Sequence, residues 1–191
     1  MSSSEIYRIV VEALELNNRD GLSFLNVGSG SGYLSCIVGY LIGKKGLCHG
    51  VEIKPVVVEH SRKCTNDWIR FRGHQSNICK NFEYIVGNCF SLDTKPVMKY
   101  DRIYVGAGCP DARWKFFLNF LKPNGVLIVS LNGANEMIHV KLKPSIPSTV
   151  TGDAMDSRHF DKETAAHVSV ASLIISDDTI NCKLSFSQDN E

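Results

Sequence analysis

The feature that most constrains the fold of this chain is a glycine cluster that separates an apolar run from an apolar segment of helix length. The cluster Gly28-Ser-Gly-Ser-Gly32 follows the run at residues 22–27 and precedes residues 33–42. A short apolar run bounded by turn residues is typical of a buried parallel strand. Residues 46–53 predict the next strand, after the turn residue Gly43. This order predicts a β-α-β unit.

The same alternation continues along the chain and predicts its fold class. An amphipathic helix is expected at residues 5–16 ahead of the first strand, and a further helix from Pro55, which is allowed at a first helical position, toward Trp68. We expect a three-layer α/β fold with a doubly wound, mostly parallel sheet. Its other elements are strands at residues 82–86, 100–105 and 126–131, and a helix at residues 112–121.

The pattern changes in the last third of the chain. Strand-like segments at residues 137–142, 167–175 and 179–186 follow one another without helices, and predict antiparallel edge strands. Residues 143–162 are rich in Pro, Ser, Thr and Asp and predict a mobile loop. We expect one domain over residues 1–186 and a frayed acidic tail at residues 187–191.

Composition and charge exclude several classes of protein. The longest apolar run, at residues 33–43, has 11 residues, whereas a membrane-spanning helix needs about 20. The first residues lack the pattern of a secretory signal, so a cytoplasmic protein is expected. The net charge of +1 gives no reason to expect nucleic acid or a membrane surface as a partner. The basic stretch at residues 54–80 is interpreted as a solvated helix face.

The cysteines predict buried, reduced thiols rather than a metal site. There are seven, an odd number, and no two of them form a C-x-x-C pair. We therefore expect no metal.

Three features are expected at the carboxyl ends of neighbouring strands, where open α/β sheets bind ligands. The glycines of the cluster permit close approach of a ligand to the backbone. Glu52 ends the next strand 52 − 32 = 20 residues after the last glycine, where a carboxylate can accept both hydroxyls of a ribose. Asn88 and Cys89 follow the third strand, where a polar side chain can meet the edge of a purine. Together these features predict a nucleoside site.

Other ligand classes fit these motifs less well. A dinucleotide fingerprint needs a small residue at position 33, and Tyr33 stands there. The phosphate-binding pattern G-x-x-x-x-G-K-[S/T] and the nucleophile elbow G-x-S-x-G are both absent from the sequence. A nicotinamide-dependent oxidoreductase is thus the less favoured alternative, and S-adenosyl-L-methionine, a nucleoside with an amino-acid arm, fits best.

At these motifs the sequence resembles the protein-L-isoaspartate O-methyltransferase family, particularly its domain-containing branch. The resemblance implies a Rossmann-like, class I S-adenosylmethionine-dependent methyltransferase that acts on isoaspartyl residues of proteins or peptides. It places Gly28, Ser29, Gly30 and Gly32 along the methionine arm, Glu52 with Ile53 at the ribose, and Asn88 with Cys89 beside the adenine. The matching segments are residues 6–131, above all 22–35, 50–53, 86–89, 100–108 and 121–125, and then 167–173.

The resemblance also shows departures from active members of the family. Asn26 and Asn88 stand where those enzymes have acidic residues, and the chain starts where a substrate-contacting loop of the Ser-Ala-Pro-His type is expected. These departures leave two hypotheses open. One is a carboxyl methyltransferase, which needs no general base because its acceptor is ionised at pH 7. The other is a catalytically weak or inactive adaptor that binds cofactor or isoaspartyl proteins.

Overall fold

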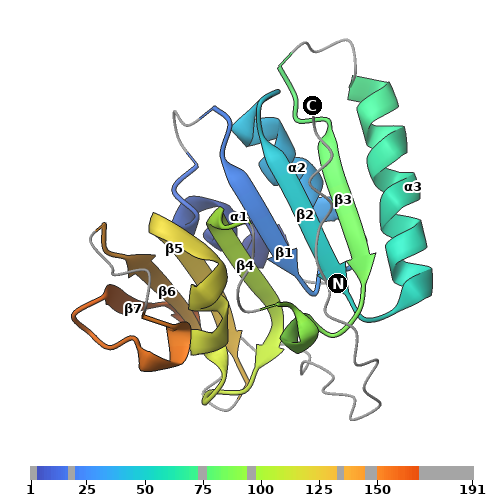
Figure 1. The fold of residues 1–191 in the computed structure, drawn as a ribbon. Helices are drawn as coiled ribbons and strands as arrows, with labels where there is room; N and C mark the ends of the chain where they lie inside the picture. The colour runs from blue at the N-terminus through green and yellow to red at the C-terminus, as the bar shows by residue number, and fades with distance from the viewer. Residues whose placement is uncertain are drawn as a thin grey trace.

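The computed structural model describes residues 4–16, 20–72, 77–93, 98–132, 136–144 and 150–167. Within these residues, helices and strands alternate along most of the chain (Figure 1). The elements are α1 (Ser4–Ala13), β1 (Ser23–Val27), α2 (Tyr33–Ile42), β2 (Leu47–Glu52), α3 (Pro55–Arg72), β3 (Asn81–Val86), η1 (Cys89–Ser91), β4 (Tyr100–Cys109), η2 (Trp114–Phe120), β5 (Leu121–Leu131), β6 (Glu136–Leu142), η3 (Gly152–Ala154) and β7 (Phe160–His167).

The described strands form one seven-stranded sheet in the order β3-β2-β1-β4-β5-β6-β7. Strands β1 to β5 pair in parallel, whereas β6 and β7 are antiparallel to their neighbours. This confirms the mostly parallel sheet with antiparallel edge strands. The chain runs outward from β1 to β3 and then returns to β4 on the other side of β1, so the order reverses between β1 and β4. Open α/β sheets bind ligands at such a point.

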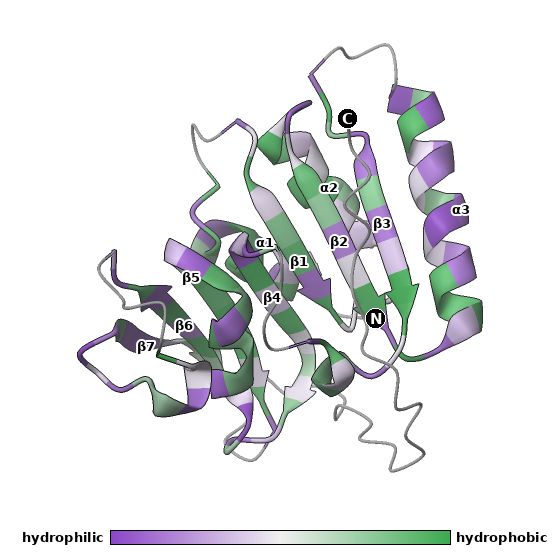
Figure 2. Ribbon diagram, in the orientation of Figure 1, coloured by the Kyte–Doolittle hydropathy of each residue, from purple (hydrophilic) through white to green (hydrophobic). Residues whose placement is uncertain are grey.

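Apolar side chains cover both faces of the sheet. On one face Phe24 and Ile128 pack with Val38 of α2 and Val10 of α1, and Figure 1 shows both helices behind the sheet. On the other face Val27 and Val105 pack with residues of η2 such as Phe117. Figure 2 accordingly shows hydrophobic residues along much of the central strands β1 and β4.

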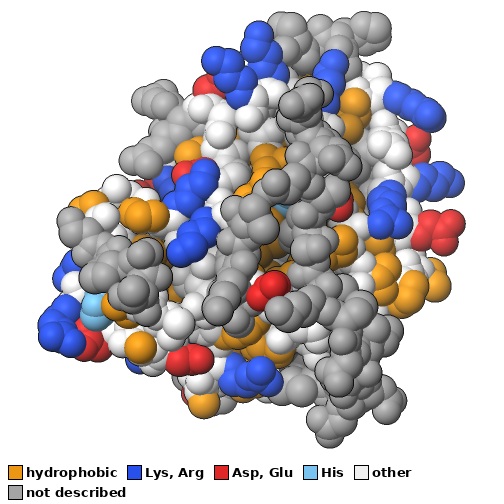
Figure 3. Space-filling model, viewed as in Figure 1, with side chains coloured by type: hydrophobic (Ala, Val, Ile, Leu, Met, Phe, Trp, Pro, Cys, Tyr) orange, Lys and Arg blue, Asp and Glu red, His pale blue; other side chains and the backbone are white. Residues whose placement is uncertain are grey.

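Helix α3 confirms the interpretation of the basic stretch. Its buried residues are Val58, Ser61 and Thr65, while Arg62, Lys63, Arg70 and Arg72 are exposed. Figure 3 shows Lys and Arg side chains along the edge of the molecule where α3 lies. No helix among the described residues has the length and apolar character that crossing a membrane requires.

The prediction of a helix at residues 112–121 was wrong. Residues Trp114–Phe120 form a 3₁₀ helix, and β5 begins at Leu121 rather than at residue 126. The buried aromatic residues Trp114, Phe117 and Phe120 recur at three-residue spacing, which is compatible with the three residues per turn of a 3₁₀ helix. Pro123-Asn-Gly125 lies inside β5, at an irregularity of its pairing with β4, and Asn124 has φ 61°.

The loop predicted at residues 143–162 was also too long. It contains η3, and β7 already begins at Phe160, paired with Leu142 of β6. Sequence analysis missed the start of this strand because the side chains of residues 161–164 are exposed and mostly charged. The predicted strand at residues 179–186, nearly all of the one at 167–175, the tail at 187–191 and Cys182 lie outside the described residues.

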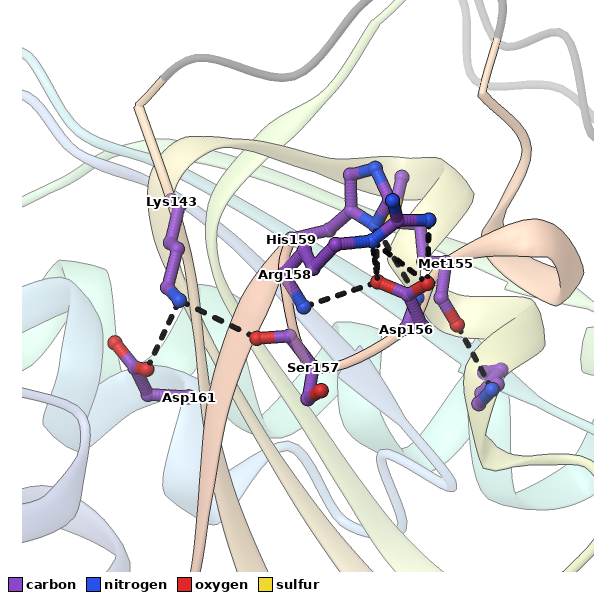
Figure 4. Close-up of polar contacts among 8 residues, drawn as sticks. Lys143, Met155, Asp156, Ser157, Arg158, His159 and Asp161 are labelled. Carbon is purple, nitrogen blue, oxygen red and sulfur yellow. Dashed lines mark hydrogen bonds and ion pairs between the residues drawn. The ribbon is translucent and has the colours of Figure 1, made fainter.

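Polar contacts join described residues near the end of β6 and the start of β7 (Figure 4). Arg158 donates hydrogen bonds to both carboxylate oxygens of Asp156, and His159 Nδ1 lies 3.0 Å from Asp156 Oδ1. Hydrogen bonds from the Arg158 side chain and backbone hold the pKa of Asp156 well below its ordinary value. Lys143 Nζ, just after β6, lies 3.4 Å from Asp161 Oδ1 of β7.

A buried arginine joins the end of α1 to the sheet. Arg102 of β4 is only 1% exposed. Its guanidinium donates hydrogen bonds to the carbonyl oxygens of Leu14, Glu15 and Asp101. Glu15 also accepts a hydrogen bond of 2.7 Å from Lys141 of β6, and this bond lowers the pKa of Glu15 despite its partial burial. Helix α1 is therefore fixed to both β4 and β6.

Candidate functional site

The glycine cluster forms a tight turn between β1 and α2 at the point where the strand order reverses. Gly28, Gly30 and Gly32 have φ values of 72°, 54° and 77°, a left-handed conformation that other residues rarely adopt. The N–H groups of Gly28 and Ser29 both donate to the carbonyl oxygen of Val51, at 2.9 and 3.1 Å. The turn is therefore attached to the end of β2.

Close packing beneath the turn gives a second reason for glycine. A Cβ atom at Gly32 would lie 2.7 Å from the hydroxyl oxygen of Tyr84, which makes a 2.9 Å hydrogen bond with Thr65. A Cβ atom at Gly50 would lie 2.4 Å from the ring of the same tyrosine. Tyr84 thus fills the space below the turn and leaves room only for hydrogen at these two positions.

Glu52 lies beside the turn, as the sequence predicts. Its Oε2 accepts a hydrogen bond of 3.2 Å from the Gly30 N–H, and its Oε1 accepts one of 3.1 Å from the Lys54 N–H. A carboxylate has about four acceptor positions, so Glu52 can still accept hydrogen bonds from a ligand. Ser61 of α3, which sequence analysis did not select, is buried with its hydroxyl 2.5 Å from the Gly30 carbonyl oxygen.

The segment after β3 lies next to Glu52. The Gly87 N–H donates to the Glu52 carbonyl oxygen at 2.9 Å. Asn88 Oδ1 accepts a hydrogen bond of 3.0 Å from the Phe90 N–H and so caps η1. Cys89 is 5% exposed, and burial raises the pKa of its thiol to about 12. The Cys89 thiol is therefore neutral at pH 7 and packs in the interior.

Two buried polar atoms near the turn lack a hydrogen-bond partner among the described residues. They are Asn26 Oδ1 and Ser29 Oγ. Asn26 Nδ2 donates to the hydroxyl of Ser35 at 3.0 Å. The Cβ atom of Ser29 lies 3.0 Å from the position that a Cβ atom would take at Gly50, so the Ser29 side chain faces β2. At Ser29 the turn is therefore formed by the backbone, and the side chain packs against β2.

The amino terminus of α2 opens onto the same turn. Gly32 is its N-cap and supplies no side chain to bond the first N–H groups of the helix, which have no intrahelical acceptors. Tyr33, the first helical residue, is 56% exposed, and the centroid of its ring lies 5.4 Å from that of Tyr7 in α1. The first turn of α2 therefore offers N–H groups and a positive dipole end to an anionic ligand.

A family model identifies the chain. The model for "Protein-L-isoaspartate(D-aspartate) O-methyltransferase (PCMT)" matches residues 1–160. The chain belongs to this family. The match extends past residue 131, where the main resemblance ends, to β6 and the start of β7, and it does not reach residues 167–173.

Curated relatives of this methyltransferase family are longer than the chain. Protein-L-isoaspartate O-methyltransferase 1 of Archaeoglobus fulgidus is 30% identical over 140 residues, which cover 73% of this chain and 59% of that protein. Protein-L-isoaspartate O-methyltransferase of Methanococcus maripaludis is 29% identical over 147 residues, or 75% of this chain and 63% of that protein. The chain thus spans about three fifths of the length of these relatives.

Solved structures of the methyltransferase family share the fold. One from Plasmodium falciparum, assigned to the protein-L-isoaspartate O-methyltransferases and solved in complex with S-adenosyl-L-homocysteine, has a TM-score of 0.70 at 19% identity. The similarity covers 92% of this chain and 76% of that one. Another protein-L-isoaspartate O-methyltransferase has a TM-score of 0.59 at 22% identity, over 77% of this chain and 43% of that chain. At these identities the comparison concerns the fold.

This member of the family shows no gathering of metal ligands in the part of the chain that the structure describes. No three His, Cys, Asp or Glu side chains there lie where they could hold a metal ion. Cys36, Cys48, Cys79, Cys89 and Cys109 are buried free thiols, and Cys64 is partly exposed.

Proposed function

We propose that this chain is an S-adenosyl-L-methionine-dependent methyltransferase that acts on isoaspartyl carboxyl groups of proteins or peptides. The observation that carries the proposal is the carboxylate of Glu52, hydrogen-bonded to the Gly30 N–H where the strand order reverses. Family membership over residues 1–160 supports the acceptor class and does not favour a non-catalytic adaptor. Cytoplasmic action is part of the proposal, and the free thiols among the described residues support it.

The residues present suit this cofactor. Glu52 has acceptor capacity left for the two ribose hydroxyls, with Ile53 beside it. The backbone of Gly28, Ser29, Gly30 and Gly32 and the N–H groups that begin α2 would border the amino-acid arm, whose carboxylate suits a helix amino terminus. Asn88 and Cys89 would flank the adenine, since the Gly87 N–H holds this segment against Glu52.

The bound cofactor would supply an electrophilic methyl group on a sulfonium centre. An acceptor carboxyl with a reference pKa of about 4 is ionised at pH 7 and needs no general base. The chain therefore has to position the acceptor and exclude water rather than move a proton. We assign no residue a catalytic role. The described residues that contribute are those that hold the turn, the Glu52 side chain and the segment after β3 in position.

The proposed activity can be tested by incubating the protein with radiolabelled S-adenosyl-L-methionine and an isoaspartyl peptide. A base-labile methyl ester should form on this peptide and not on the same sequence with a normal aspartyl residue. Absence of ester at high protein concentration would reject the enzyme. Binding of the isoaspartyl peptide without transfer would point instead to an adaptor.

Replacing Glu52 by alanine should weaken binding of S-adenosyl-L-homocysteine by about 1–3 kcal/mol, the scale for loss of a charged hydrogen-bond partner. Titration calorimetry would measure the dissociation constant. A parallel titration with NAD would test the alternative ligand, that of a nicotinamide-dependent oxidoreductase. Glu59→Ala, which removes an exposed carboxylate of α3, is the matched control and should leave binding unchanged. An unaltered dissociation constant in Glu52→Ala would mean that the ribose binds elsewhere.

A further inference from the structure

An arginine and a phenylalanine connect two loops at the carboxyl edge of the sheet. The Cζ atom of Arg113 lies 3.7 Å from the centroid of the Phe90 ring. Phe90 lies in η1 after β3, whereas Arg113 follows β4 and its N–H donates to the Pro110 carbonyl oxygen at 2.8 Å. Strands β3 and β4 are not neighbours, because β2 and β1 lie between them. The stacked pair therefore links the loops on either side of the strands that carry Glu52 and the glycine turn.

The positive charge of Arg113 affects the pKa values of two buried thiols, Cys89 and Cys109. Burial raises the pKa values of Cys89 and Cys109 to about 12, and Arg113 acts against this rise at both thiols. Asp111 is the acidic group nearby, since it adds to the rise at Cys109. Arg113 thus lies close to the segment that follows Asn88, although sequence analysis gave no reason to select it.

The Arg113 guanidinium is placed to receive an anion. Its side chain is exposed, and none of the carboxylates within the described ranges forms an ion pair with it. Stacking on Phe90 occupies the flat face of the group and restricts its orientation. The N–H groups along its edge stay available, and these match the two oxygens of a carboxylate.

We propose that Arg113 binds a carboxylate of the acceptor polypeptide, on an acidic side chain that flanks the methylated residue. This inference rests on the proposed function and adds a specificity-determining residue to it. The reacting carboxylate itself is the less suitable partner, because hydrogen bonds from a guanidinium would withdraw charge from the oxygen that attacks the methyl group. Arg113 therefore selects acceptors with a negative neighbour and takes no part in the chemical step.

The test compares two fluorescently labelled isoaspartyl peptides that differ only by Glu or Gln next to the isoaspartyl residue. Fluorescence anisotropy in the presence of S-adenosyl-L-homocysteine gives each dissociation constant without turnover. The wild-type protein should bind the Glu peptide about 1.5- to fivefold more tightly, the range for a charged contact at an exposed site. Arg113→Met should abolish this preference, and Arg113→Lys should retain part of it. Arg70→Met, which removes an exposed arginine of α3, should leave the preference intact.

Three results would overturn the role of Arg113. These are equal binding of the two peptides by the wild-type protein, equal weakening of both peptides in Arg113→Met, and weaker binding of S-adenosyl-L-homocysteine by that variant. The last would make Arg113 a support for Phe90 and the cofactor segment. Failure of the proposed function is a separate result, because it is the absence of methyl ester in the wild-type protein, whereas the anisotropy assay reads peptide binding alone.

Discussion

Replacing Arg102 by methionine is expected to lower the free energy of unfolding by about 3–5 kcal/mol, because it leaves three carbonyl oxygens without their hydrogen-bond donor. The side chain is 1% exposed and donates to the carbonyl oxygens of Leu14, Glu15 and Asp101. Methionine keeps most of the volume but donates no hydrogen bond, so these acceptors lose their partner at a cost of about 1–3 kcal/mol for each one left unsatisfied. The end of α1 should then separate from the sheet.

Urea unfolding monitored by circular dichroism would measure this change, with Arg8→Met as the matched control. Arg8 makes an exposed ion pair with Glu12 one turn along α1, and such pairs contribute about 0.3–0.5 kcal/mol. A loss below about 1 kcal/mol in Arg102→Met would show that water replaces the guanidinium at these carbonyl groups.

Gly32→Ala should destabilise the protein by about 2–4 kcal/mol, because it combines backbone strain with overpacking. The residue has φ 77°, and its new Cβ atom would lie 2.7 Å from the Tyr84 hydroxyl oxygen and 3.2 Å from Thr65 Oγ1. A left-handed conformation costs a residue with a Cβ atom about 1–2 kcal/mol. The remainder comes from displacing Tyr84, whose hydroxyl bonds Thr65.

Gly30→Ala separates these two contributions. Gly30 has φ 54°, but a Cβ atom there would find only the Gly28 carbonyl oxygen, at 4.0 Å. This variant should therefore lose only the backbone strain of about 1–2 kcal/mol. Tyr84→Phe should also rescue part of the loss in Gly32→Ala, since it removes the atom that the new methyl group meets. Equal losses in Gly30→Ala and Gly32→Ala would reject the packing argument.

Much of the fold follows from patterns that are local in the sequence. The apolar runs and glycines around Gly28 and Gly32 specify a strand, a turn and a helix over a short stretch, and the structure has all three. The segment at residues 112–121 was harder to predict, because the spacing of its buried aromatic residues is compatible with an α-helix as well as with a 3₁₀ helix. β7 begins in a charged segment at the sheet edge, where alternation of apolar and polar residues gives little signal.

The site could be predicted only in part for a related reason. Glu52 can be predicted from its separation in sequence from the glycines. Arg113 contacts Phe90 only because loops that are distant in the sequence pack together. The two asparagine departures also have local roles that the sequence does not reveal. Asn26 donates to Ser35, which a carboxylate could not do, and Asn88 caps η1 through its carbonyl oxygen.

The hydrogen bonds from Gly28 and Ser29 to Val51, and from Gly30 to Glu52, have a consequence for the kinetics of ligand binding. They hold the turn in its conformation by contacts within the protein, so a ligand meets a loop that is already ordered. Little conformational entropy is then lost on association. The rate at which a nucleoside enters should accordingly depend on diffusion and access to the crevice rather than on slow rearrangement of the glycine turn.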